Sequence, residues 1–288
     1  MNSILVSGAT GLLGRSLVPH LRKRGHTIVT QARVDDADFL VDLSDRNNVY
    51  EMLSQIQPTA IVNLVGLTSV EGCQEQTNAA YLANTKTVEN IAQWMRQSGK
   101  ECHLIQISTD HLYDGSGPHT EEIVTLTNNY ALTKYSGELA AASVSSTILR
   151  TNFIGLSKAT NRASLTDWVF ASLKNGENIK VLEDVFFSPL SMTTLSEMIH
   201  LVIEQKPIGT YNLGSRNGMS KADLDFAFAE YLGLKTKTMT RINSDQATFL
   251  KTYRPKDMRL DSTKFEKALQ LTMPNLSDEI KLAAKDYL

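Results

Sequence analysis

Cysteine is scarce in this sequence: only Cys73 and Cys102 occur among 288 residues. Two cysteines without a partner motif predict no disulfide framework and favour a reducing compartment, so we expect a cytoplasmic protein. Long apolar runs are also lacking, since no stretch approaches the ~20 residues that a membrane helix needs. Residues 4–6 already resemble a strand, so we expect no signal peptide before them.

No excess of either charge is present, because 29 basic residues face 31 acidic ones and the net charge is -2. Without a basic stripe, neither nucleic acid nor an anionic membrane is an expected partner. The histidines also lack a spacing that is typical of metal ligands. His103, His111 and His119 are eight residues apart and fall on a strand, an edge and a loop, so we expect no metal site.

What the sequence does contain is an alternation of strand-like and helix-like segments. After Thr151 the elements become shorter and are separated by loops rich in glycine, serine and asparagine. The alternation predicts an α/β protein with a Rossmann-type doubly wound parallel sheet. We predict a dinucleotide-binding domain at residues 1–150 and a smaller, partly interleaved substrate-binding lobe at 151–288. Strands are expected at 3–7, 26–31, 59–64, 103–108 and 146–150, and helices at 47–57, 79–97, 130–142, 165–174, 194–204, 222–232 and 276–287.

The clearest motif is the glycine-rich segment GATGLLG at residues 8–14. It follows a strand and opens a helix, which is the context that dinucleotide binding requires. Gly8 permits a tight turn, Gly11 lets backbone amides approach a pyrophosphate, and Gly14 lets the helix pack closely. The helix dipole then attracts phosphate. A glycine turn that binds nothing is the alternative. We expect the cofactor contacts of this turn to be Gly8, Thr10, Gly11, Leu12, Leu13 and Gly14.

The end of the second strand bears on which dinucleotide binds. It ends Gln31-Ala32-Arg33, and the next acid is Asp35. NAD is usually held by a carboxylate on its ribose 2′-hydroxyl, whereas an arginine pairs well with the 2′-phosphate of NADP. Arg33, assisted by Arg15, therefore favours NADP, and NAD stays open. In the alternative interpretation, Arg33 is a solvated loop cation.

Tyr130 and Lys134 are four residues apart and so share one face of a helix, one turn apart. Tyrosine has a pKa near ~10, and a neighbouring ammonium lowers it by stabilising the phenolate. The pair therefore predicts acid–base chemistry. Thr109, which follows a strand, is placed to hydrogen-bond a substrate carbonyl oxygen. The alternative is a surface tyrosine beside a solvated lysine.

Together these motifs resemble the extended short-chain dehydrogenase/reductases. Among them the chain is most similar to dTDP-4-dehydrorhamnose reductase and related nucleotide-sugar reductases, over most of its length. The segments that carry the resemblance are GATGLLG at 8–14, Asp42-Leu43, NLVG at 63–66, Asn84, ISTD at 107–110, YALTK at 130–134, Gly137-Glu138, LRT at 149–151 and RP…RLD at 254–261.

The resemblance implies a catalytic triad of Thr109, Tyr130 and Lys134, in which Tyr130 protonates the oxygen of a ketone and Lys134 also binds the nicotinamide ribose. It implies a place in the proton relay for Asn84 and contact with the nucleotide sugar for Arg259. The further cofactor residues expected are Asp42, Leu43, Asn63, Leu64, Val65, Asn84 and Tyr130. The substrate residues expected are Asp110, His111, Asn152, Phe187 and Arg259.

The function predicted from these features is an NADP-preferring reductase of a keto group on a nucleotide-activated deoxysugar. Departures from the family pattern, including His111 in place of an aromatic residue, leave the sugar and its nucleotide open, and a homodimer also stays open. One alternative is a dinucleotide-binding regulatory subunit similar to that of methionine adenosyltransferase. Another is an epimerase or dehydratase, although a dehydratase would have glutamate at the position of His111.

Overall fold

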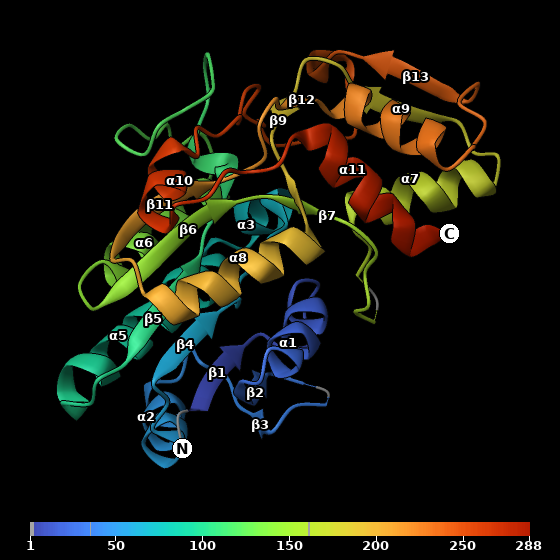
Figure 1. Ribbon diagram of the computed structural model, residues 1–288. Helices are drawn as coiled ribbons and strands as arrows, with labels where there is room; N and C mark the ends of the chain where they lie inside the picture. Colours follow the sequence, from blue (N-terminus) through green and yellow to red (C-terminus); the bar gives the residue numbers. More distant parts are fainter. Residues whose placement is uncertain (1–2, 35, 161) are drawn as a thin grey trace. The chain divides into compact units, whose positions relative to one another are not determined.

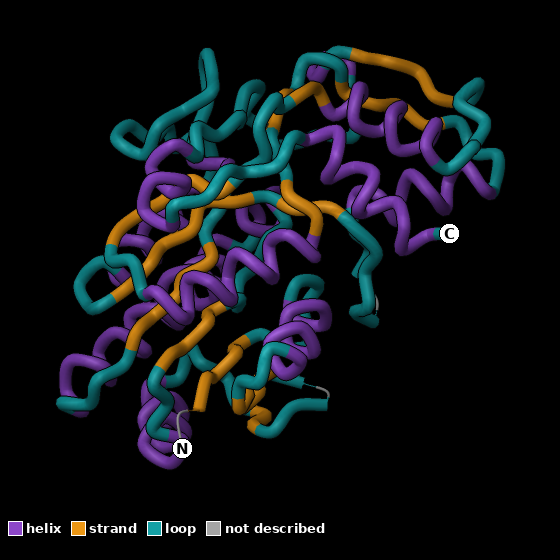
Figure 2. Tube along the Cα trace, viewed as in Figure 1, coloured by secondary structure: helices purple, strands orange, loops and turns teal. Residues whose placement is uncertain are grey.

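A central parallel sheet organises the chain, as Figures 1 and 2 show. The computed structural model describes residues 3–34, 36–160 and 162–288. In these residues the sheet has seven strands in the order β11-β6-β5-β4-β1-β2-β3, and each neighbouring pair from β6 to β3 is parallel. The predicted α/β class is confirmed. The strands are β1 Ser3–Ser7, β2 Thr27–Ala32, β3 Phe39–Leu40, β4 Ala60–Asn63, β5 His103–Ile107, β6 Ser146–Thr151 and β11 Gly209–Leu213.

Helices cover both faces of this sheet, because its central strands are apolar on both sides. In Figure 1, α1 and α8 lie on one face, whereas α2, α5 and α6 lie on the other. On the second face Leu5, Ile61 and Leu104 of the strands pack with Ile91 and Trp94 in one core. The helices are α1 Gly14–Lys23, α2 Arg46–Ile56, α5 Thr87–Ser98, α6 Asn129–Ala141 and α8 Met192–Gln205.

The single helix predicted at residues 79–97 is wrong in detail. The chain instead forms α4 (Thr77–Tyr81), a π-helical turn η1 (Leu82–Lys86) and then α5, and a short helix α3 (Val70–Glu75) precedes them. Apolar periodicity does not separate these segments, because α4, η1 and α5 are all helical and follow one another directly. A Cβ added to Gly137 of α6 would lie 2.3 Å from the carbonyl oxygen of Asn84, so α6 presses directly on η1. Such π-turns occur often at functional sites.

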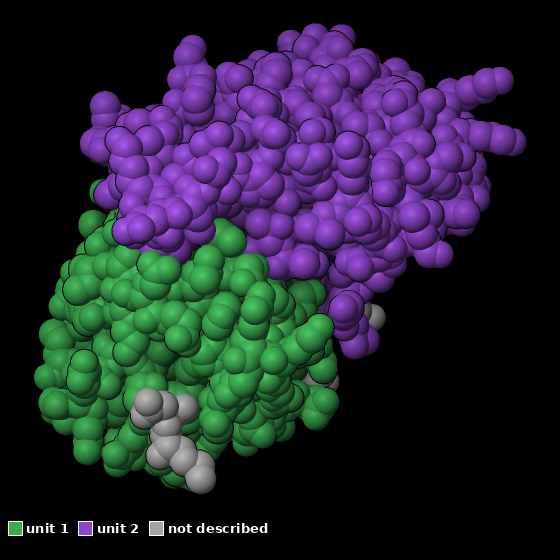
Figure 3. Space-filling view, in the orientation of Figure 1, with its two compact units in different colours: residues 1–109, 128–150, 196–211 green, residues 110–127, 151–195, 212–288 purple. Residues whose placement is uncertain are grey.

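The chain forms two compact units, which Figure 3 colours separately. Unit 1 comprises residues 1–109, 128–150 and 196–211, and unit 2 comprises 110–127, 151–195 and 212–288. Both predicted segments, 1–150 and 151–288, therefore contribute to both units. Within the described residues, no helix combines the length and the apolar character needed to cross a bilayer.

Unit 2 has its own hydrophobic core, which includes Phe187, Leu224 and Phe228. Several of its strands have two residues, too few for an alternating pattern to predict them. The strands pair as β7 (Phe153–Ile154) with β10 (Leu190–Ser191), β8 (Ile179–Leu182) with β13 (Met239–Ile242), and β9 (Phe186–Phe187) with β12 (Met219–Ser220). Its helices are α7 Leu165–Lys174, α9 Lys221–Tyr231, α10 Thr263–Leu269 and α11 Leu276–Ala284, and short 3-10 turns are η2 Asp110–Leu112, η3 Ser244–Gln246 and η4 Lys285–Tyr287.

Close packing at Gly137 gives a first prediction. Gly137→Ala places a methyl group against the backbone of Asn84, and overpacking of this kind lowers the free energy of unfolding by about 1–3 kcal/mol. Urea unfolding measures the loss. The matched control is Ser136→Ala, at the neighbouring half-buried position, which should stay within about 0.5 kcal/mol of wild type. Equal stability of the two variants would contradict the packing account.

Candidate cofactor site and active site

The glycine-rich turn has the conformation that its sequence predicts. Gly8 has a φ of +72°, which favours glycine, and its amide donates a hydrogen bond to Oε1 of Gln31 at 3.2 Å. A Cβ at Gly8 would lie 3.1 Å from the carbonyl carbon of Leu64. A Cβ at Gly14 would lie 2.4 Å from the carbonyl oxygen of Ala9, so α1 approaches the turn too closely for any side chain.

The N-terminus of α1 differs from those of α2, α6, α7 and α9. Each of these four has a side chain that caps it, whereas α1 has no side-chain cap and no acidic residue in its first turn. A Cβ at Gly11 would meet only the carbonyl oxygen of Gly8 among the described atoms. Thr10 and Leu12 are half-buried, and Leu13 is buried. The turn therefore leaves room and amide donors for an anionic group.

Beside the turn lies a cavity of about 160 Å³. Four predicted cofactor residues line it: Arg33, Asp42, Leu43 and Val65. Arg33 is exposed, Asp42 accepts a hydrogen bond from the amide of Ser44 at 2.9 Å, and Leu43 packs its side chain into the core. The structure thus brings together residues from the ends of β2 and β4 and from the segment after β3.

Gln31 orders this region, a role that the sequence did not reveal. Its Oε1 accepts from the amide of Gly8, and its Nε2 donates to the carbonyl of Val41 at 2.7 Å. One buried side chain therefore links the glycine turn to the segment that carries Asp42. A polar residue at the end of a buried strand was the available signal.

Arg15, suggested as a partner of Arg33, lines a different hollow of about 330 Å³. Its guanidinium lies 3.8 Å from the carboxylate of Asp36. The geometry therefore does not bring the two arginines to one cavity. Asp35 lies outside the described residues.

Asn63 joins the carboxyl ends of three strands. Its Oδ1 accepts from Ser7 Oγ at 2.7 Å and from the amide of Val65 at 3.2 Å, and its Nδ2 donates to Oε1 of Gln106 at 2.7 Å. The amide of Leu64 donates to the carbonyl of Ser7 at 3.1 Å. Asn63 is fully buried, so it shapes the strand ends around the cavity.

The helix α6 carries the predicted acid–base pair. Asn128 caps it, since its Oδ1 accepts from the amide of Ala131 at 2.9 Å. Tyr130 is 7% exposed and packs with Val70 and Cys73. Lys134 donates from Nζ to the carbonyl of Ile107 at 2.7 Å. Burial lowers the pKa of Lys134 to about 8, and the negative charge of Glu138 opposes that shift.

Asn84, on the π-helical turn, lies beside this pair. Its Oδ1 accepts from the amide of Leu67 at 2.8 Å, and its Nδ2 donates to the carbonyl of Leu67 at 3.1 Å and to Thr133 Oγ1 at 3.0 Å. A Cβ added to Gly66 would lie 3.0 Å from Asn84 Oδ1 and 3.8 Å from Lys134 Nζ. The structure therefore brings Asn84 and Lys134 together around one glycine.

A buried ion pair underlies the same place. Arg150 of β6 donates from Nε to Oε1 of Glu138 at 3.0 Å and from Nη2 to Oε2 at 2.7 Å, and Ser108 Oγ also donates to Oε1. Thr109 follows Ser108 and is 4% exposed. The pair fixes α6 to the carboxyl ends of β5 and β6, where Thr109 and Lys134 lie.

In unit 2, Asn152 donates from Nδ2 to the carboxylate of Asp110 at 2.7 Å. Burial lowers the pKa of His111 to about 3, and the nearby charges of Lys221 and Arg254 lower it further. The pKa of Lys221 is lowered by burial, although Asp110 raises it. Three predicted substrate residues thus gather with two cations that were not predicted as site residues.

These two cations also line a hollow of about 660 Å³, together with Trp168, Phe249 and Asp225. Burial raises the pKa of Asp225 to about 8, against the opposing effect of Lys221, and Asp225 Oδ1 has no hydrogen-bond partner among the described residues. Cations beside apolar rings suit a ligand that carries both negative charge and a flat ring. Lys221 and Asp225 were missed because charged helix residues usually face solvent.

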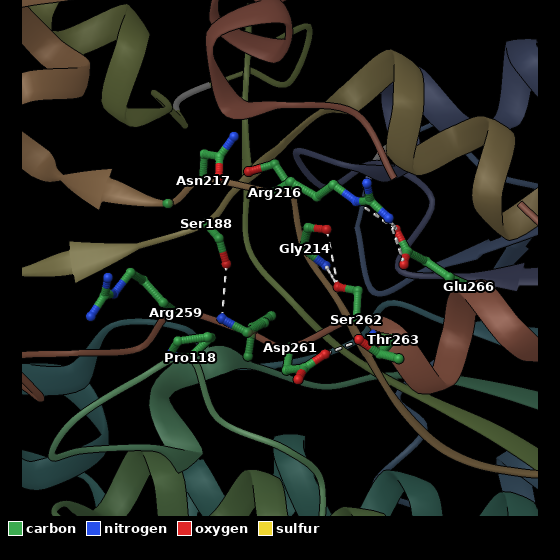
Figure 4. A pocket seen from close by; sticks show the side chains of 13 residues that line it. Pro118, Ser188, Gly214, Arg216, Asn217, Arg259, Asp261, Ser262, Thr263 and Glu266 are labelled. Atoms are coloured by element: carbon green, nitrogen blue, oxygen red, sulfur yellow. Dashed lines mark hydrogen bonds and ion pairs between the residues drawn. The ribbon is translucent and has the colours of Figure 1, made fainter. Parts of the chain in front are cut away.

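Arg259 lies in another hollow, of about 610 Å³, which Figure 4 shows. Its Nε and Nη2 donate to the carboxylate of Asp257 at 2.9 and 2.6 Å. Arg216 lines the same hollow and pairs with Glu266. The guanidinium groups of Arg216 and Arg259 point away from each other in Figure 4. Arg254 does not line this hollow, so Arg259 and Arg254 lie in different hollows.

Phe187, expected among the substrate residues, packs inside unit 2, and its contact with substrate stays a prediction. Phe187 is 1% exposed and belongs to the core of unit 2, where the Lys221 ammonium lies 5.7 Å from its ring centroid. Strand alternation turns Phe187 inward and leaves its neighbour Phe186 half-buried. The Arg259 guanidinium lies over the ring of Phe186, 5.4 Å from its centroid.

Comparison with known proteins identifies the family. All of residues 1–288 match the RmlD substrate binding domain family. The chain belongs to this family. It is 29% identical over 294 residues to the dTDP-4-dehydrorhamnose reductase of Shigella flexneri, covering 97% of this chain and 96% of the relative. It is 27% identical over 278 residues to methionine adenosyltransferase 2 subunit beta of Mus musculus, covering 91% and 81%.

Solved structures agree on the fold. The crystal structure of a dTDP-4-dehydrorhamnose reductase from Clostridium acetobutylicum matches with a TM-score of 0.89 at 23% identity, with 98% of each chain covered. The match to the family model confirms the predicted family resemblance, and the predicted class of oxidoreductase agrees with the name of the Shigella flexneri relative.

The buried ammonium gives a second prediction. Folding lowers the pKa of Lys134 from 10.5 to about 8, so the unfolded chain holds this proton more tightly than the folded one. Stability contributed by this group must then rise as pH rises from about 8 to about 10.5. Urea unfolding of wild type and Lys134→Met across this range isolates the effect. The wild-type free energy of unfolding should increase relative to that of the variant, and a constant or falling difference would contradict the burial of a charged amine.

Proposed function

We propose that this chain is an NADP-preferring reductase of a keto group on a nucleotide-activated deoxysugar, with Tyr130 as the proton donor. The observation that carries the proposal is the arrangement on α6. Tyr130 and Lys134 are one turn apart, and the Lys134 ammonium is buried against the Ile107 carbonyl at 2.7 Å. The named activity of the Shigella flexneri relative supports the choice of substrate.

The residues present suit a dinucleotide. The turn at 8–14 and the uncapped N-terminus of α1 would hold the pyrophosphate, and the cavity lined by Asp42, Leu43 and Val65 would hold the adenine. When bound, the reduced nicotinamide supplies the hydride. Asn63 and Leu64 would line the same strand end, and Lys134 would reach the ribose.

The side chains of unit 1 would supply the proton. A positive charge one turn away stabilises the phenolate and so lowers the pKa of tyrosine, which eases proton release to the substrate oxygen. Lys134 holds that charge in place through its bond to Ile107. The hydroxyl of Thr109 would hydrogen-bond the same substrate oxygen, and Asn84 would support the relay that returns a proton to Tyr130.

The substrate side would be formed by unit 2. Lys221 and Arg254 offer two cations to a diphosphate, and Trp168 and Phe249 offer apolar rings to a nucleobase in the same hollow. Asp110, His111 and Asn152 would meet the sugar next to these cations. Arg259 stays a prediction from the resemblance, because it lines a separate hollow.

A second candidate function is a dinucleotide-binding subunit with little turnover, favoured by the similarity to the mouse methionine adenosyltransferase subunit. A protein that only binds does not require Tyr130 and Lys134 to be held as an acid–base pair. The two candidates differ in whether Tyr130 matters for turnover.

The third prediction concerns that tyrosine. With NADPH and a dTDP-4-keto-6-deoxysugar, Tyr130→Phe should turn over at least ~10²-fold more slowly than wild type, because the general acid is lost. The loss of near-ultraviolet absorbance measures turnover. NADPH affinity should stay unchanged. Tyr135→Phe, on the same helix, is the matched control and should keep wild-type turnover, whereas unchanged turnover of Tyr130→Phe would remove the proposed mechanism.

Cofactor preference is the subject of the fourth prediction. Arg33 is an exposed cation at the cavity, so Arg33→Ala should weaken NADPH binding about tenfold, the loss of one charge-assisted hydrogen bond, and leave NADH binding nearly unchanged. Fluorescence titration measures both dissociation constants. Arg15→Ala, in the other hollow, serves as the control. Equal losses for the two cofactors would exclude Arg33 as the 2′-phosphate ligand.

A further inference from the structure

Two histidines and a glutamate of unit 1 converge away from the candidate active site. His26 lies between α1 and β2, and His200 and Glu204 lie on α8. Nε2 of His26 is 2.9 Å from Nδ1 of His200 and 3.6 Å from Oε1 of Glu204. All three potential ligand atoms lie within 4.8 Å of one another, and within residues 3–34, 36–160 and 162–288 no other trio of histidine, cysteine or carboxylate groups does so.

These separations suit one small metal ion. In tetrahedral coordination with bonds of about 2.0–2.1 Å, neighbouring ligand atoms are about 3.3 Å apart. The two separations that involve His26 Nε2, 2.9 and 3.6 Å, lie on either side of that value. His200 and Glu204 are four residues apart on α8, so the helix itself presents both from one face.

A hydrogen bond between the two histidines does not account for the position of Glu204. One imidazole could donate to the other at 2.9 Å, but the 3.6 Å separation from Glu204 is too long for a hydrogen bond. The two rings meet at 62° with centroids 5.1 Å apart, so they are not stacked. A bound cation would use all three groups at once.

The neighbouring charges single out this trio. Glu197, nearly two turns earlier on α8, already accepts hydrogen bonds from His20 and Arg24, so its charge is compensated. The side chain of His26 is 14% exposed and that of Glu204 is 56% exposed. An ion can therefore enter from solvent, and water can take the remaining coordination position.

We propose that His26, His200 and Glu204 bind a divalent transition-metal ion of the zinc class. Two imidazoles and one carboxylate favour Zn²⁺, Co²⁺, Ni²⁺ or Cu²⁺ over Mg²⁺ and Ca²⁺, which prefer all-oxygen sites. The ion would clip α8 to the connection between α1 and β2 and so stabilise the dinucleotide-binding motif. This site is independent of the proposed reductase activity. It departs from the expectation of no metal, which was based on the spacing of His103, His111 and His119, whereas His26 and His200 are 174 residues apart in sequence.

The test uses the full chain after treatment with a chelator and dialysis. Calorimetric titration with Zn²⁺ should show one ion per chain, and Co²⁺ should give the visible absorption bands of tetrahedral coordination. His200→Ala and Glu204→Gln should each weaken Zn²⁺ binding at least ~10–100-fold, since even residues that only orient a ligand contribute this much. Zn²⁺ should raise the melting temperature of wild type and not that of His200→Ala.

His20→Ala is the matched control, because His20 also contacts a glutamate of α8. It should bind Zn²⁺ like wild type, and Mg²⁺ should not bind at millimolar concentration. Circular dichroism without metal should show that every variant is folded. The proposal would be overturned by the absence of Zn²⁺ binding to wild type, by equal affinity in His200→Ala, or by an equal loss in His20→Ala.

Discussion

The buried ammonium of Lys134 is the constraint on which the candidate active site depends. A buried charge is destabilising, and for Lys134 a hydrogen bond and an opposite charge offset part of that cost. The Ile107 carbonyl receives its hydrogen bond, and Glu138, one turn along α6, supplies the opposite charge. Because Arg150 holds Glu138 in turn, α6 has one position against the strand ends, and Tyr130 has one position with it.

Much of the fold follows from local patterns. A short apolar strand, a glycine turn and a helix identify β1 and α1, and the same alternation predicts β4, β5, α6 and β6 within a residue or two. The π-helical turn at Leu82–Lys86 could not be predicted from local periodicity, and it packs against Gly137, which lies 53 positions from Asn84 in the sequence. The two-residue strands of unit 2 were not predicted, because two residues are too few to show an alternating apolar pattern.

The candidate site likewise contains some residues that could be predicted from the sequence and some that could not. Arg33, Asp42, Leu43 and Val65 follow strand ends, so their meeting at one cavity could be expected from a parallel sheet. Gln31, Lys221 and the cluster of His26 with His200 could not, since tertiary contacts alone give them partners. The burial of Phe187 could not be predicted, because a two-residue strand gives no indication of which side chain faces inward.

The central claim is that the chain transfers a hydride and does not merely bind a dinucleotide. NADPH deuterated at the transferred position of the nicotinamide, incubated with a dTDP-4-keto-6-deoxysugar, tests it most directly. Mass spectrometry of the sugar nucleotide should show one deuterium in the reduced product, at the carbon that carried the ketone. Binding of both ligands by the folded protein, with no deuterium in the sugar, would contradict the claim and favour the subunit that only binds.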